Sequence, residues 1–188
     1  ISNLTLIKKI LTDSKKIKKP INGVVNNAGE RQRKDFLKIN KTQLNNLFEN
    51  NFFNHFYLIQ KMIRDFKKNS MQKTFSFINI GSIVGVKGFS QLSGYASTKS
   101  ALDGLTRSLA IEFANDKIRF NIVHPGFIKT SYYEKFKKKE NLYKWTLKKT
   151  PLGIWGESED VSELVIFLLS EKSKYITGQS ICVDGGWT

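Results

Sequence analysis

With 188 residues, of which 40% are hydrophobic, the chain is long enough for one buried core and short for two, so we expect a single domain over residues 1–188. No apolar stretch approaches the ~20 residues of a membrane-spanning helix and no signal-peptide pattern opens the chain, which excludes a membrane protein and indicates a cytoplasmic one. The 31 Lys and Arg residues against 16 Asp and Glu give a net charge of +15, but they are scattered without zinc-finger spacing, so we expect a solvated surface and no nucleic-acid partner.

Short β-branched runs alternate with segments of helical periodicity, and no internal repeat or low-complexity linker interrupts them. Such alternation is typical of an α/β fold built on a parallel sheet. The chain opens with a helical segment, for which Ser2 or Asn3 is available as the N-cap. The expected elements are, in order, a helix near 4–17, a strand at 21–25, a helix at 42–67, a strand at 74–80, a helix at 96–114, a strand at 118–123, a helix at 158–169 and a strand at 180–183.

The helix expected at 42–67 carries more apolar residues than one core contact needs. Asn40 and Gln43 match a capping box at its start. Several aromatic residues lie close together on it, namely Phe52, Phe53, Phe56 and Tyr57. We therefore expect this helix to pair with its counterpart in a homodimer.

The segment at about 127–157 is long for a connection in an α/β fold, so we expect a lid or substrate loop. Its many lysines would attract an anionic ligand, and its aromatic residues would suit a ring or an acyl group. These aromatic residues are Phe127, Tyr132, Tyr133, Phe136, Tyr143 and Trp145. The only cysteine, Cys182, lies in an expected strand, which indicates a structural thiol and rules out an internal disulfide.

Tyr95 and Lys99 lie four residues apart on an expected helix, so both side chains project from one face. A lysine ammonium beside a phenol favours the phenolate, and we expect it to lower the pKa of Tyr95 from about 10. By itself the pair would also suit a solvated helix face. Ser82, however, directly follows an expected buried strand, and ligands of parallel sheets bind at the carboxyl ends of strands. The three residues together indicate acid–base chemistry on a substrate oxygen.

Motifs spread over nearly the whole chain occur together in one order. They are VVNNAG at 24–29, Asn51, Ser82 with YASTK at 95–99, HPGFIKT at 124–130, YITGQ at 175–179 and VDGGW at 183–187. This set resembles the NNAG, Ser…YxxxK and PG…T signature of the short-chain dehydrogenase/reductase family, including its 3-oxoacyl-[acyl-carrier-protein] reductase-like members. The resemblance implies a Rossmann-like, doubly wound parallel sheet and an enzyme that interconverts a carbonyl and a secondary alcohol by hydride transfer with NAD or NADP.

The same resemblance implies the roles of individual residues. Tyr95 would be the general acid or base, and Lys99 would lower its pKa and bind the nicotinamide ribose. Ser82 would orient the substrate carbonyl, and Asn51 would hold a water that links Lys99 to solvent. The residues implied to contact the cofactor are Asn27, Ala28, Gly29, Tyr95, Lys99, Pro125, Gly126, Ile128 and Thr130.

Some of these positions also have a structural interpretation. Asn51 would serve equally as a helix cap or breaker, and Thr130 as an N-cap. We expect Asn26 to hold strands together. His55 and His124 are expected to be structural, because neither has a partner at metal-ligand spacing.

The family's glycine-rich TGxxxGxG turn, which binds the pyrophosphate, has no counterpart in the sequence. The chain resembles the C-terminal two thirds of the family's fold, beginning just after the third strand, and lacks the position that distinguishes NAD from NADP. We therefore expect these 188 residues alone to bind dinucleotide poorly and to be inactive.

Other functions stay open. A truncated, non-catalytic scaffold or oligomerisation protein would keep the same helices, and a nucleic-acid binder is favoured by net charge alone. For an enzyme, we expect a small-molecule carbonyl or alcohol substrate. A 3-oxoacyl carrier-protein reductase and a sugar or hydroxy-acid dehydrogenase both fit, and the family resemblance suggests a homotetramer.

Overall fold

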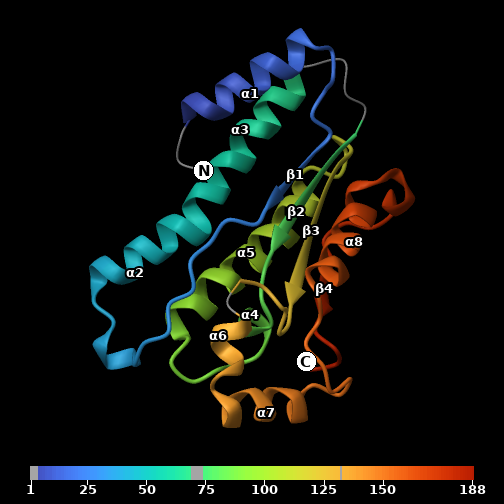
Figure 1. The fold of residues 1–188 in the computed structure, drawn as a ribbon. Helices are drawn as coiled ribbons and strands as arrows, with labels where there is room; N and C mark the ends of the chain where they lie inside the picture. Colours follow the sequence, from blue (N-terminus) through green and yellow to red (C-terminus); the bar gives the residue numbers. More distant parts are fainter. Residues whose placement is uncertain (1–3, 69–73, 132) are drawn as a thin grey trace.

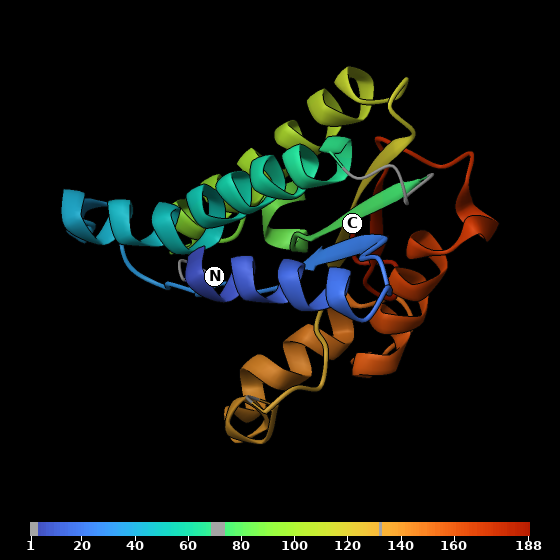
Figure 2. The ribbon, with the colours of Figure 1, turned by 90° about the horizontal axis from the view of Figure 1, so that it is seen from above.

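The computed structural model describes residues 4–68, 74–131 and 133–188, which form a four-stranded parallel sheet between layers of helices (Figures 1 and 2). The strands lie side by side in chain order as β1 (Gly23–Asn26), β2 (Phe75–Ile80), β3 (Ile118–Pro125) and β4 (Ser180–Val183). Helices α3 (Asn54–Lys68) and α5 (Ser93–Glu112) pack on one face and α8 (Ser158–Leu169) on the other. The expected α/β fold with a parallel sheet is confirmed.

Burial of both faces explains why the two central strands carry apolar residues on each side. On β2, Phe75 and Phe77 join the core formed with α3 and α5, while Ile78 points to the core formed with α8. Phe77 stacks on Phe120 of β3 with ring centroids 4.8 Å apart. The sheet is therefore a rigid middle layer that fixes the positions of the loops at its carboxyl edge.

Most elements lie close to their predicted bounds. Helix α8 and strand β4 match the prediction, whereas the first strand pairs with β2 only from Gly23 onward, two residues later than expected. Helix α1 (Leu4–Lys16) forms the predicted opening helix. The N-cap predicted at Ser2 or Asn3 lies outside the described residues. The structure also has short 3₁₀ turns at Phe36–Lys38 and Glu171–Ser173.

The helix predicted at 42–67 is interrupted. It consists of α2 (Lys41–Phe48), a π-helical turn at Glu49–Phe53, and α3. The capping box is present, since Gln43 N donates to Asn40 Oδ1 at 2.9 Å and Asn40 N donates to Gln43 Oε1 at 3.3 Å. A π turn widens the helix locally and is frequent at functional sites.

The segment at 127–157, expected as a loop, contains two helices, α6 (Tyr133–Lys137) and α7 (Glu140–Lys149). Trp155 is buried against Phe127 and Phe136, and its Nε1 donates to Thr146 Oγ1 at 2.8 Å. The segment is thus a small folded unit with its own aromatic core. Tyr132, which was also predicted to belong to it, lies outside the described residues.

A further short helix, α4 (Ile83–Val86), follows β2 directly and was not predicted. None of the helices in the described ranges is long and apolar enough to cross a membrane.

Candidate active site

The predicted site residues gather at the carboxyl ends of the strands. A cavity of about 340 Å³ opens there, between the segment after β1, Ser82 after β2, the end of β3 and helix α5. Of the predicted site residues, only Ala28 and Asn51 do not line it. Those that do are Asn27, Gly29, Ser82, Tyr95, Lys99, Pro125, Gly126, Ile128 and Thr130.

Tyr95 and Ser82 both line this cavity. Burial raises the pKa of the Tyr95 phenol, and the nearby Ser82 hydroxyl, as a hydrogen-bond donor to the phenolate, and the charge of Arg31 lower it only in part. The expectation that Lys99 lowers the pKa of Tyr95 is therefore wrong for this structure. Desolvation outweighs the groups that favour the phenolate, and the positive charge that lowers the pKa of Tyr95 is that of Arg31 instead of Lys99.

Lys99 lies one helical turn after Tyr95 and is 4% exposed. Its Nζ donates to Ile80 O at 2.7 Å and lies 5.8 Å from the centroid of the Tyr95 ring. Burial lowers the pKa of Lys99 to about 8. The amine thus stays mostly charged at neutral pH but releases its proton far more readily than a surface lysine.

Ser82 is fixed from two sides. Its hydroxyl accepts from Val84 N at 3.2 Å as the N-cap of α4. Its backbone lies against the fully buried His124, whose Nδ1 is 3.2 Å from Ser82 N and 3.1 Å from Ser82 O. Gly81 makes room for this ring, because a Cβ at that position would lie 2.4 Å from His124 Nδ1.

The contact between His124 and Ser82 was missed by sequence reasoning, which treated the histidine only as structural. The available signal was a glycine immediately before Ser82, at the position where β2 continues beside His124 on β3. His124 touches only the backbone of Ser82, so it positions the serine from behind the cavity.

Asn51 is fully buried on the π turn and makes contacts on both sides. Its Oδ1 accepts from Glu30 N at 2.7 Å, and its Nδ2 donates to Glu30 O at 2.8 Å and to Thr98 Oγ1 at 3.1 Å. A Cβ at Gly29 would lie 3.2 Å from Asn51 Oδ1 and 3.6 Å from Lys99 Nζ. Asn51 therefore ties the segment after β1 to α5, close to Lys99, and a side chain in place of Gly29 would crowd Asn51.

Asn26 and His55 hold the base of the site, as expected. Asn26 Nδ2 donates to Asn79 Oδ1 at 2.7 Å and so joins β1 to β2. His55 Nε2 lies 2.7 Å from Ala28 O, and burial lowers the pKa of this histidine, which favours the neutral ring that donates to the carbonyl. Ala28 is thereby fixed through its backbone, behind the cavity wall.

The segment after β3 is held to the sheet by backbone hydrogen bonds. Gly126 N donates to Val183 O at 2.9 Å, and Ile128 pairs with Gly156 as an isolated bridge. Thr130 is exposed at the rim of the cavity, and its carbonyl accepts from Tyr133 N at 2.8 Å. The cavity is thus bounded by fixed backbone on three sides and by α5 on the fourth.

Comparison with known proteins agrees with this arrangement. Over residues 1–188 the chain matches the family described as Enoyl-(Acyl carrier protein) reductase. It is 39% identical over 168 residues to a tropinone reductase homolog of Arabidopsis thaliana, covering 89% of this chain and 62% of that protein. It is 33% identical over 186 residues to a 3-oxoacyl-[acyl-carrier-protein] reductase of Buchnera aphidicola, covering 99% of this chain and 74% of that one.

A solved 4-hydroxyisoleucine dehydrogenase complexed with NADH superposes with a TM-score of 0.89 at 28% identity, over 100% of this chain and 76% of that one. The chain spans less than two thirds of the length of the tropinone reductase homolog. The likeness nevertheless extends over the whole of the present sequence, and most of the predicted site residues line one cavity. The chain therefore belongs to the short-chain dehydrogenase/reductase family.

Proposed function

We propose that this protein is an NAD(P)-dependent oxidoreductase that interconverts a carbonyl and a secondary alcohol. The observation that supports this most is the convergence of Tyr95, Ser82 and Lys99 on one cavity at the carboxyl ends of three parallel strands. The dehydrogenase of similar fold that is complexed with NADH supports the choice of cofactor class. The similar proteins named as reductases support the same type of reaction.

The residues around the cavity fit the nicotinamide half of such a cofactor. Gly29 has no side chain at the point where Asn51 and Lys99 approach it, so the cavity stays open beside the Lys99 amine. Lys99 and Tyr95 would hold the ribose hydroxyls, while the backbone at Gly126 and Ile128 would meet the carboxamide. Asn27 and Thr130 would complete the contacts. When bound, NADH or NADPH supplies the hydride and the oxidised cofactor accepts it.

In the direction of reduction, Tyr95 and Ser82 would both donate hydrogen bonds to the substrate carbonyl oxygen. These bonds stabilise the negative charge that develops on the oxygen as the carbonyl carbon is reduced. Tyr95 then transfers its proton to that oxygen as the general acid. Since burial keeps the pKa of Tyr95 above its ordinary value, the phenol holds the proton it needs at neutral pH.

Lys99 and Asn51 would restore that proton. The buried ammonium of Lys99 lies against the Tyr95 ring, and we propose that a water near Asn51 links it to solvent. This proposal is supported by the convergence of Asn51 and Lys99 at Gly29. In alcohol oxidation the same groups would carry the proton the other way.

Carbonyl reduction is expected to fall as pH rises through about 8. Lys99, whose pKa is lowered to about 8, then loses its charge, whereas Tyr95 keeps its proton because its pKa lies above the ordinary value. The measurement is kcat/KM for reduction between pH 6 and 10. A Lys99→Arg variant with residual activity should lose this alkaline fall, because a guanidinium stays charged. A profile that is flat to pH 10 in the unmodified protein would contradict the role of Lys99.

A non-catalytic scaffold is the alternative, and cofactor difference spectra separate the two. In a version that also carries the family's N-terminal glycine-rich segment, a scaffold would give no spectral change with NADH or NADPH, whereas an enzyme would. The poor dinucleotide binding expected of these 188 residues alone stays a prediction.

We also propose that the folded unit at 127–157 is the substrate lid of the domain.

We propose in addition that the protein is a homo-oligomer, assembled through an aromatic face on the π turn and α3. Rings along this face contact one another from Phe48 to Tyr57 at centroid distances of 5.7 to 6.4 Å. Phe53 is 40% and Tyr57 57% exposed, although both are large apolar side chains. Exposed apolar surface of this kind is typical of protein interfaces.

Replacing both Phe53 and Tyr57 with Ser is expected to convert the oligomer to monomer in sedimentation velocity at micromolar concentration. The control is Tyr175→Ser, which removes a fully exposed aromatic ring far along the chain from this face. An unmodified protein that already sediments as a monomer would refute the proposal, as would a double variant that stays oligomeric.

A further inference from the structure

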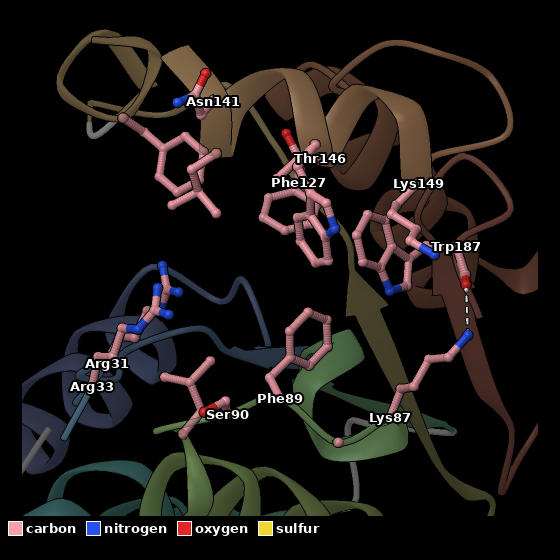
Figure 3. A pocket seen from close by; sticks show the side chains of 15 residues that line it. Arg31, Arg33, Lys87, Phe89, Ser90, Phe127, Asn141, Thr146, Lys149 and Trp187 are labelled. Carbon is pink, nitrogen blue, oxygen red and sulfur yellow. Dashed lines mark hydrogen bonds between the residues drawn. The ribbon is translucent and has the colours of Figure 1, made fainter. Parts of the chain in front are cut away.

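A second, larger cavity of about 810 Å³ adjoins the catalytic one (Figure 3). Arg31, Phe89, Leu92 and Phe127 line both cavities, so the two spaces are continuous at the site of reaction. The outer cavity lies between the segment after β1, the start of α5 and the helical unit of 127–157. A substrate whose carbonyl lies beside Tyr95 therefore has room to extend into the outer cavity.

Two arginines enter this cavity from the segment after β1. Figure 3 shows the side chains of Arg31 and Arg33 reaching into the space that faces Asn141 of α7. Arg31 makes no hydrogen bond or ion pair to other residues in the described ranges. Arg33 donates from Nε to Gln91 Oε1 at 3.1 Å, which leaves its terminal amino groups available. Both guanidinium groups are thus free to bind a ligand.

The segment that carries these arginines is held in place. Asn51 binds both backbone groups of Glu30, the residue immediately before Arg31. Lys34 N donates to Gln91 O at 2.8 Å just after Arg33. The two arginines therefore lie on a short stretch fixed at each end, so less conformational freedom is lost when a ligand binds.

No acidic side chain of the described residues lines the outer cavity. Acidic residues of the neighbouring segments have other partners, and Asp35 accepts from Gln91 at 2.6 Å and pairs with Lys38 at 3.1 Å. Glu30 lines the catalytic cavity but not the outer one and accepts from Asn50 at 3.2 Å, Glu140 pairs with Lys144 at 2.6 Å, and Glu157 pairs with Lys129. The positive charge of Arg31 and Arg33 is therefore not neutralised from within the cavity.

The other wall is aromatic. Trp187 contacts Phe89, Phe127 and Trp145 at centroid distances of 5.9, 5.0 and 5.4 Å. Lys87 is already engaged there, since its Nζ donates to Trp187 O at 3.1 Å (Figure 3). This wall offers an apolar surface for a ring or an alkyl chain, while hydrogen-bond donors for an anion come from the arginine side.

We infer that the substrate is an amphipathic anion, whose carboxylate or phosphate oxygens bind Arg31 and Arg33 and whose apolar body packs on the aromatic wall formed by Phe89, Phe127, Trp145 and Trp187. This inference rests on the proposed function and names the substrate class: an oxo or hydroxy compound with an anionic group and an apolar ring or chain. The influence of Arg31 on the pKa of Tyr95 is consistent with an anion site close to the catalytic phenol.

The test is a binding measurement that needs no turnover. Two tryptophans lie in the aromatic wall, so their fluorescence reports on ligands in this cavity. The probes are 4-phenylbutanoate and its neutral counterpart 4-phenylbutanamide, with 3-phenylpropyl phosphate as a second anion. None of them contains a ketone or an alcohol. We expect the carboxylate to bind at least about tenfold more tightly than the amide, as two charge-assisted contacts would give.

The double variant Arg31→Gln, Arg33→Gln should lose that preference while amide binding stays within about twofold. The matched control is the double variant Arg64→Gln, Lys68→Gln, which also removes two positive charges, from exposed positions on α3 outside the cavity, and should leave the preference intact. The phosphate probe identifies the group: tighter binding than the carboxylate assigns a phosphate, and weaker binding a carboxylate.

Equal affinity for the carboxylate and the amide would overturn the inference. So would an effect of Arg64→Gln, Lys68→Gln as large as that of the Arg31→Gln, Arg33→Gln variant, because the net charge of +15 would then explain the attraction. The proposed function can fail without the anion site. Anion preference without any cofactor-dependent reduction of ketones would contradict the proposed function and leave the anion site standing. Turnover of neutral ketones by a protein without anion preference would refute only the anion site.

Discussion

In a version of the protein that also carries the family's N-terminal glycine-rich segment, replacing Tyr95 with Phe is expected to reduce turnover by about 10² to 10⁴, the usual contribution of a general acid. The change removes only the hydroxyl, which lies in the cavity with Ser82, and leaves the ring near the Lys99 amine. Lys99 and the backbone of the cavity would keep the other cofactor contacts, so cofactor affinity should fall far less than turnover. The measurements are kcat for a reduced carbonyl substrate and the dissociation constant of the reduced cofactor by fluorescence.

Tyr175→Phe serves as the matched control, because this side chain is 99% exposed and lies outside the cavity. It should keep full activity. If Tyr95→Phe retained more than about half of the activity, Tyr95 would not be the proton donor, and another acid in the cavity would have to be sought.

Much of the fold could be predicted because its signals are local. Helix α8 and strand β4 were predicted with the bounds that the structure has. The helix shows a continuous helical periodicity, and the strand is a short apolar run that ends at Asp184-Gly185-Gly186. The clustering of Ser82, Tyr95 and Lys99 could also be anticipated, because parallel strands bring their carboxyl ends to the same edge.

The π turn could not be predicted in the same way. A π turn inserts one residue into a helix without any distinctive composition, so the periodicity from Thr42 to Lys67 read as continuous. The sequence placed an interruption only at Asn51, from the family resemblance. What the interruption does became visible in three dimensions, where the amide of Asn51 spans Glu30 and Thr98.

The electrostatics of the site were the least predictable feature. Sequence spacing suggested that Lys99 lowers the pKa of Tyr95. Burial of both groups dominates instead: it raises the pKa of Tyr95 and lowers that of Lys99, so each side chain favours its neutral form. Arg31 influences Tyr95 from a different segment of the chain, which no spacing argument could reveal. Desolvation depends on the whole packed neighbourhood and not on neighbours along one helix.

The burial of Lys99 has a measurable consequence for stability. Its pKa falls from 10.5 to about 8, and one pH unit is worth about 1.4 kcal/mol, so keeping this amine charged in the folded protein costs about 3 kcal/mol at neutral pH. The hydrogen bond to Ile80 O returns about 1 kcal/mol of this. A residue proposed for the proton relay is therefore a net destabilising one for the fold.

Lys99→Met is accordingly expected to abolish turnover and to raise the free energy of unfolding by about 1 to 2 kcal/mol at pH 7. Below pH 8 both folded and unfolded chains carry the charge, so the gain should be constant there. Between about 8 and 10.5 the folded protein releases the proton first, the unmodified protein becomes relatively more stable, and the gain should shrink. Urea denaturation at pH 7 and pH 10 measures both values. Lys148→Met, on the exposed surface of α7, should change neither. A Lys99→Met protein that is less stable than the unmodified one at pH 7 would show that the ammonium is compensated within the fold, and that its burial does not oppose folding.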